Sequence, residues 1–124
     1  HPLSRRQRQM CIRDRNKTFL PANTTNDFLA IRPSGNPITA KGLAGMYDSD
    51  DLVIELSELV KIHRLEANSD WGFTAFTLKE AFSYKGDLNN DLSTYSLIFK
   101  KIDGIWKIAW MQRSQGTTDI STWD

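Results

Sequence analysis

The last quarter of the chain constrains its fold most, because it contains two long β-type segments joined by a tight turn. The segments are residues 92–102 and 105–115, and the turn is Ile102-Asp103-Gly104. Aspartate followed by glycine between apolar runs is a strong hairpin signal. We therefore expect two paired antiparallel strands at this end of the chain.

The second of these strands is apolar on both of its alternating faces. One parity holds Trp106, Ile108 and Trp110, and the other holds Ile105, Ala109 and Met111. A sheet that met water on one side would carry polar residues on that side. We therefore expect both faces to be covered, one by a helix and the other by a partner subunit. Self-association of this kind is usually two-fold, so the sequence predicts a homodimer, with a monomer whose sheet curls over itself as the alternative.

The rest of the chain predicts one further strand, one short helix and two more strands of an antiparallel meander. Thr39 can cap a helix that runs through Tyr47. The segment 52–65 is a long strand with a bulge or bend near Ser57-Glu58, and 85–91 is a hairpin loop rich in turn-forming residues. The expected strands are residues 28–32, 52–65, 71–84, 92–102 and 105–115.

Length and composition indicate one globular domain. The 124 residues can bury one core, and 40% hydrophobic with 25% charged residues is ordinary for such a domain. No apolar run approaches the roughly 20 residues that a membrane-spanning helix needs. We expect a cytoplasmic protein that does not bind membranes.

Basic residues are concentrated in the first 15 positions, which hold five arginines and one aspartate. Such a segment could bind phosphates as a nucleic-acid arm, but it also resembles a translated sequencing adapter in the run Met-Cys-Ile-Arg-Asp-Arg. We interpret residues 1–15 as a non-native or disordered leader and 16–124 as the single domain. The domain then has 11 basic and 14 acidic residues, a net charge of −3, which disfavours nucleic-acid binding.

Cysteine and histidine are too scarce for several kinds of site. Cys11 belongs to the leader, so the domain has no thiol nucleophile or disulfide. His63 is the one histidine after His1, which excludes a multi-histidine metal centre. We expect no metal and no cofactor.

The ending Lys101-Ile-Asp-Gly104, followed by Trp106-Lys-Ile-Ala-Trp-Met-Gln-Arg-Ser114, resembles the nuclear transport factor 2-like superfamily. That group includes ketosteroid isomerases, scytalone dehydratase, SnoaL-like polyketide cyclases and the association domain of calmodulin-dependent kinase. The patterns at 31–37 and 82–86 resemble an uncharacterised subgroup. The resemblance implies an α+β fold in which a strongly curved antiparallel sheet forms a cone around helices, with a pocket in its mouth.

One part of the chain departs from that family. Its members begin with a long helix that closes the cone, whereas residues 16–27 carry proline, several asparagines and three threonines. We therefore expect the N-terminal helix to be missing or truncated.

His63 is the candidate general base, because an unperturbed imidazole titrates near neutral pH. Ketosteroid isomerases use an aspartate base beside a tyrosine and a neutral carboxylic acid, but the aspartates here lie mostly in predicted turns, where they are usually solvated. A surface or packing histidine is the alternative for His63. Its catalytic use would require it to face the pocket beside a tyrosine or carboxylate.

Arg32 and Arg113 are the strongest candidates for ligand binding. Each lies in an apolar strand, where a buried charge needs a partner. Two guanidinium groups near the pocket could bind a carboxylate, and structural ion pairs are the alternative. The full candidate set for ligand binding is Arg32, Tyr47, Trp71, Tyr84, Trp110 and Arg113.

Two functional hypotheses follow from this reading. The first is a cone-fold domain that binds a small apolar or acidic ligand and self-associates. The second is an isomerase, dehydratase or cyclase that uses His63. Fold alone does not choose between them.

Overall fold

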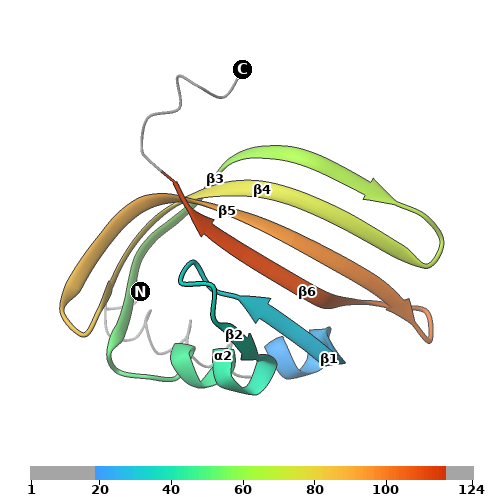
Figure 1. Ribbon diagram of the computed structural model, residues 1–124, viewed down its shortest axis with the longest axis horizontal. Helices are drawn as coiled ribbons and strands as arrows, with labels where there is room; N and C mark the ends of the chain where they lie inside the picture. Colours follow the sequence, from blue (N-terminus) through green and yellow to red (C-terminus); the bar gives the residue numbers. More distant parts are fainter. Residues whose placement is uncertain (1–18, 117–124) are drawn as a thin grey trace, which may run out of the picture.

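One curved six-stranded sheet dominates the molecule, of which the computed structural model describes residues 19–116 (Figure 1). The strands lie in the order β2-β1-β6-β5-β4-β3. Neighbouring strands run antiparallel except β1 and β6, which are parallel. The strands are β1 (Thr24–Ile31), β2 (Pro37–Thr39), β3 (Leu52–Ala67), β4 (Trp71–Tyr84), β5 (Asp87–Ile102) and β6 (Ile105–Gln115). The fold is α+β with an open, strongly bent sheet, as the sequence predicts.

Helix α2 (Ala40–Tyr47) lies inside the curve of the sheet (Figure 1). Thr39 caps it as predicted, because its Oγ1 accepts a hydrogen bond from the N–H of Gly42 at 3.1 Å. The apolar face of α2 packs on β1 and β6 and forms a small core with them. The buried core residues are Leu20, Phe28, Ala30, Leu43 and Ala44. Met46 and Tyr47 pack against this core. Because the Thr39 cap sets where α2 begins, it also helps to position Tyr47, the last residue of the helix.

Two-residue turns join the last three strands. Lys85 and Gly86 connect β4 to β5, and Asp103 and Gly104 connect β5 to β6; all four have positive φ. Positive φ at both central residues is the turn geometry that fits the twist of a hairpin. The predicted loop at 85–91 was therefore wrong beyond its first two residues. Strand β5 begins at Asp87 because its pairing with β4 continues to the turn.

Bulges bend the two strands at the rims of the meander. Strand β3 shifts register at three points, between Ile54 and Leu56, between Leu59 and Lys61, and between Ile62 and Arg64. The predicted irregularity in this strand is present, but it lies on either side of Ser57-Glu58. An extra residue on one strand bends that strand and increases its twist, which fits the strong curvature.

A further bulge in β6 corrects the predicted faces of that strand. Phe99 pairs with Ile108 and Ile98 pairs with Trp110, so Ala109 is the extra residue. Ile108 and Met111 consequently both pack against the core. Simple alternation along the sequence predicts that the side chains of Ile108 and Trp110 lie on the same face of β6. This prediction was wrong, because the extra residue Ala109 puts them on opposite faces.

Residues 19–23 are helical and lead directly into β1. The sequence predicts an N-terminal helix that is missing or truncated, and within the described residues five helical positions precede β1. Leu20, on this helical turn, is a core residue. The predicted leader at 1–15 lies outside the described residues. No helix within residues 19–116 is long and apolar enough to cross a bilayer.

The cap of α2 gives a stability prediction. Replacing Thr39 with alanine removes the acceptor for the Gly42 N–H, and we expect the free energy of unfolding to fall by about 0.5–2 kcal/mol. Thr39→Ser keeps a hydroxyl and serves as the control. Urea unfolding followed by circular dichroism measures both variants. Equal stability of the alanine variant and the wild type would show that the cap contributes nothing.

Candidate functional site

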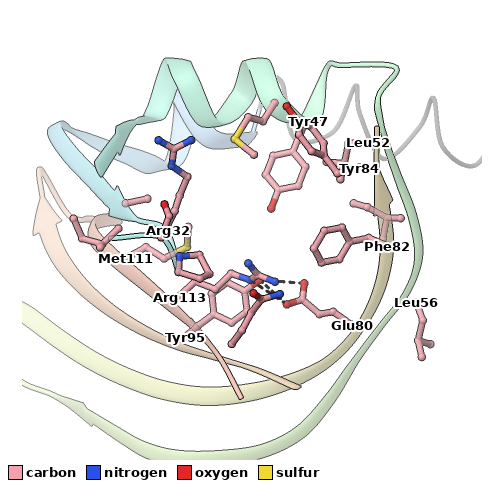
Figure 2. Close-up of a pocket in the computed structure, with 17 residues that line it drawn as sticks. Arg32, Tyr47, Leu52, Leu56, Glu80, Phe82, Tyr84, Tyr95, Met111 and Arg113 are labelled. Carbon is pink, nitrogen blue, oxygen red and sulfur yellow. Dashed lines mark hydrogen bonds and ion pairs between the residues drawn. The ribbon is translucent and has the colours of Figure 1, made fainter. Parts of the chain in front are cut away.

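The concave face of the sheet and helix α2 enclose a pocket of about 350 Å³ (Figure 2). This volume is in the range of small-molecule sites. Strands β1, β3, β4, β5 and β6 all contribute to the lining. The apolar part of the wall includes Met46, Leu52, Ile54, Phe82, Tyr84 and Met111. The charged lining residues are Arg32, Glu80 and Arg113.

A hydrogen-bonded network of Glu80, Tyr95 and Arg113 forms one side of this pocket (Figure 2). The Tyr95 hydroxyl donates to both carboxylate oxygens of Glu80, at 2.9 Å and 3.1 Å. Arg113 Nε lies 3.5 Å from Glu80 Oε1, and Nη2 donates to Ser93 Oγ at 3.0 Å. The side chains of Glu80 and Arg113 are only 17% and 19% exposed. The network therefore holds a charged pair where an unpaired charge would be costly.

The strand register brings these residues together. Tyr95 on β5 pairs with Arg113 on β6 and with Phe76 on β4, so the three side chains share one face. Glu80 is four residues beyond Phe76 and has the same parity. The ring of Tyr95 stacks on Phe76 with centroids 5.4 Å apart, which fixes the direction of its hydroxyl.

Tyr47 presents its hydroxyl to the pocket from the last turn of α2 (Figure 2). Burial raises its pKa above the ordinary value of 10.0, and the negative charge of Glu80 raises it further, while Arg113 opposes the shift. Burial likewise raises the pKa of Tyr95, with further contributions from Glu80 and Tyr47. Both phenols are therefore neutral near pH 7 and can donate hydrogen bonds.

Arg32 approaches the pocket from the end of β1 on a different side from Glu80 (Figure 2). Its Nε donates to the backbone oxygen of Asn36 at 3.3 Å. Within residues 19–116 no carboxylate oxygen lies within ion-pair distance of the Arg32 guanidinium. Arg113, in contrast, is paired with Glu80 and sits 5.5 Å from the ring of Phe82. The two predicted arginines thus meet at one pocket but are not equivalent.

His63 does not line the pocket. It is an exposed residue of β3, and its Nε2 lies 2.7 Å from Thr77 Oγ1, which in turn lies 2.7 Å from Thr94 Oγ1. Thr77 and Thr94 are paired across β4 and β5 and have the parity opposite to Phe76 and Tyr95. His63 therefore bonds to the outer face of the sheet, away from the cavity.

The other predicted ligand-binding residues divide between pocket and surface. Tyr47 and Tyr84 line the cavity, whereas Trp71 and Trp110 do not. Trp71 is half exposed at the start of β4. Trp110 pairs with Ile98 and Leu29, and its neighbour Met111 is the one that packs against the core.

Among the pocket residues that the sequence analysis missed, Glu80 and Tyr95 form the polar network. Glu80 has the parity of Phe76, Leu78 and Phe82, so a charged residue interrupts an otherwise apolar face of β4. That interruption was the available signal. Among residues 19–116, no three His, Cys, Asp or Glu side chains gather as a group that could hold a metal ion.

Comparison with known proteins supports this architecture. The family described as "Protein of unknown function (DUF3804)" matches residues 7–124. The chain is 45% identical to a crystal structure of an NTF2-like protein of unknown function from Prochlorococcus marinus. That match covers 98% of this chain and 100% of that one, with a TM-score of 0.79. No curated protein matches this chain.

More distant solved structures share the fold alone. One is a putative calmodulin-dependent kinase II association domain from Exiguobacterium sibiricum, 15% identical, with a TM-score of 0.75 and coverage of 96% of this chain and 98% of that chain. Another is a ketosteroid isomerase-like protein from Erwinia carotovora, which is 18% identical with a TM-score of 0.61. That match covers 87% of this chain and 91% of that chain. These likenesses agree with the predicted nuclear transport factor 2-like cone.

The two buried phenols predict how stability depends on pH. Their pKa values are raised on folding, so the unfolded chain ionises near pH 10 while the folded chain keeps both phenols protonated. Their contribution to stability is therefore complete below pH 10 and is lost as the pH rises above it. Urea unfolding between about pH 8 and 11, with phenolate absorbance recorded in parallel, measures this loss.

Tyr95→Phe serves as the matched variant for this experiment. We expect its free energy of unfolding to fall less steeply above pH 10 than that of the wild type, because one raised pKa has been removed. If phenolate absorbance shows that all three tyrosines ionise in the folded protein while its free energy of unfolding stays constant, the burial of these two phenols is contradicted.

Proposed function

Because the chain belongs to the DUF3804 family, whose function is unknown, we propose a function from its own pocket: it binds a small carboxylic acid with an apolar body. We further propose that the chain forms a homodimer through the outer face of its sheet. The pocket supports the first statement, and the apolar outer face, which no helical segment within residues 19–116 covers (Figure 1), supports the second.

The charge balance of the pocket favours an anionic ligand. Arg32, Glu80 and Arg113 line the cavity, and together they carry one net positive charge. Glu80 offsets Arg113, which leaves the Arg32 guanidinium without a carboxylate among the described residues. A planar guanidinium can donate two parallel hydrogen bonds to a carboxylate. This unpaired Arg32 is the observation that carries the proposal.

The walls of the pocket suit an apolar body behind the carboxylate. Met46, Phe82 and Met111 come from three different elements and line the cavity. Apolar and aromatic lining with a few placed polar groups is typical of small-molecule sites.

An isomerase, dehydratase or cyclase that uses His63 is the alternative function. It requires His63 to face the pocket, whereas His63 bonds to Thr77 on the outer face of the sheet. The observed placement therefore favours ligand binding over catalysis by this residue.

Removal of Arg32 tests the proposed ligand class. We expect Arg32→Met to weaken binding of small aromatic and aliphatic monocarboxylates by about tenfold or more, because a charge-assisted hydrogen bond contributes about 1.5–3 kcal/mol. Isothermal titration calorimetry against a panel of such acids measures the effect. Arg64→Met is the matched control, since Arg64 is exposed and paired with Glu66 away from the pocket.

The same titrations also define the result that would contradict the proposal. If no acid binds the wild type, or if Arg32→Met and Arg64→Met bind equally well, Arg32 does not anchor a carboxylate and the proposal fails.

The outer face of the sheet supports the proposed dimer. Four apolar residues on neighbouring strands form a row across it: Leu29 pairs with Trp110, Trp110 with Ile98, and Ile98 with Phe73. We call these four residues the outer row. Each alternates with a residue of the opposite face, such as Ala30 or Leu97 in the interior. The helical segments within residues 19–116 both lie on the concave side (Figure 1).

A charge in the outer row should separate the subunits. We expect the wild type to be a dimer by light scattering and native mass spectrometry, and Ile98→Glu to be monomeric at micromolar concentrations, because the interface would bury an unpaired carboxylate. Leu65→Glu is the control, since Leu65 is 70% exposed and pairs with Thr74 on the other face. A monomeric wild type would refute the dimer.

A further inference from the structure

The pocket has a second polar region whose chemistry differs from that of Arg32. It consists of the Glu80 carboxylate and the Tyr47 hydroxyl, which face the cavity from β4 and α2 (Figure 2). A ligand that fills the cavity must meet both regions. The ligand class can therefore be specified beyond a simple carboxylic acid.

Glu80 can still accept a hydrogen bond from a ligand. An ionised carboxylate has about four acceptor positions, and the described partners of Glu80 are the Tyr95 hydroxyl and the Arg113 guanidinium. Its negative charge would repel a ligand carboxylate placed beside it, and the adjacent Arg113 guanidinium would repel a ligand cation. The group that fits next to Glu80 is consequently a neutral donor.

Tyr47 can complete the same group. Its phenol is largely buried, its oxygen opens onto the cavity, and no described residue forms a hydrogen bond with it. Burial raises its pKa, so the hydroxyl keeps its proton. It can donate to a ligand oxygen while Glu80 accepts from that oxygen's hydrogen. A hydroxyl group satisfies both requirements, whereas an apolar group would leave the Tyr47 hydroxyl without a partner and would not use the remaining acceptor positions of Glu80.

The positions of the polar regions set the order of groups along the ligand. Arg32 lies on one side of the cavity and Glu80 on another (Figure 2), and apolar side chains such as Phe82 and Met111 line other parts of its wall. The volume of about 350 Å³ accommodates a ligand with one aromatic ring.

We infer that the ligand is a hydroxy acid, with its carboxylate at Arg32, an apolar or aromatic body in the middle, and a hydroxyl between Tyr47 and Glu80. This inference rests on the proposed function, since it assumes that Arg32 binds a carboxylate. It adds that the pocket distinguishes a hydroxy acid from an acid of the same shape without the hydroxyl.

A matched pair of probes tests the inference. The probes are 4-hydroxyphenylacetate and 4-methylphenylacetate, which differ in one group of similar size. Calorimetry on the full chain should give a dissociation constant about tenfold or more lower for the hydroxy acid, because the hydroxyl bonds to a charged acceptor. Equal affinities for the two acids, or a preference for the methyl acid, would overturn the inference and leave the proposed function standing.

Two variants locate the hydroxyl within the pocket. Tyr47→Phe and Glu80→Gln should each reduce the preference for the hydroxy acid severalfold, whereas Arg32→Met should weaken both acids alike. Circular dichroism and thermal unfolding check that each variant is folded. Tyr47→Phe is the more conservative change and suffices if Glu80→Gln does not fold. A preference that Tyr47→Phe leaves unchanged would overturn the placement of the hydroxyl.

The calorimetric result that would refute the proposed function differs from the result that would refute the hydroxyl site. If neither these two acids nor any acid of the wider panel binds the wild type, the carboxylate site itself is absent. If both acids bind the wild type equally well, only the proposed hydroxyl site is refuted and the carboxylate site at Arg32 stands.

Discussion

The pocket depends on the ion pair between Glu80 and Arg113, which places two opposite charges on the concave face of a bent sheet. Removal of one partner would leave the other poorly solvated, which for a fully buried pair costs about 3–5 kcal/mol. Tyr95, on the strand between them, bonds to both oxygens of Glu80. The pair therefore fixes a polar surface and leaves Arg32 as the lining cation without an ion-pair partner among residues 19–116.

The curvature of the sheet places these groups around a cavity. Bulges in β3 and β6 bend the rim strands, and α2 sits inside the bend, where its capped first turn and buried Leu43 hold it against β1. Tyr47 reaches the cavity because it ends this helix. The site is thus assembled from elements far apart in sequence, with Arg113 lying 33 residues from Glu80.

Local sequence patterns predicted the elements better than their assembly. The Asp103-Gly104 turn, the Thr39 cap and the long strands all follow from short-range preferences, and each is present. The side assigned to Ile108 was wrong because a bulge depends on pairing with a neighbouring strand. The pairing of Arg113 with Glu80 was missed for the same reason. Register across three strands decides which charges meet, and no single strand carries that information.

A double-mutant cycle on Glu80 and Arg113 tests most directly whether this pair holds the site. The free energies of unfolding of Glu80→Gln, Arg113→Met and the double variant would be measured in urea at pH 7. We predict that the double variant loses less stability than the two single losses together, with a coupling energy of about 1.5 kcal/mol or more. Additive losses, within about 0.5 kcal/mol, would contradict the account, because they would show that the two side chains act independently.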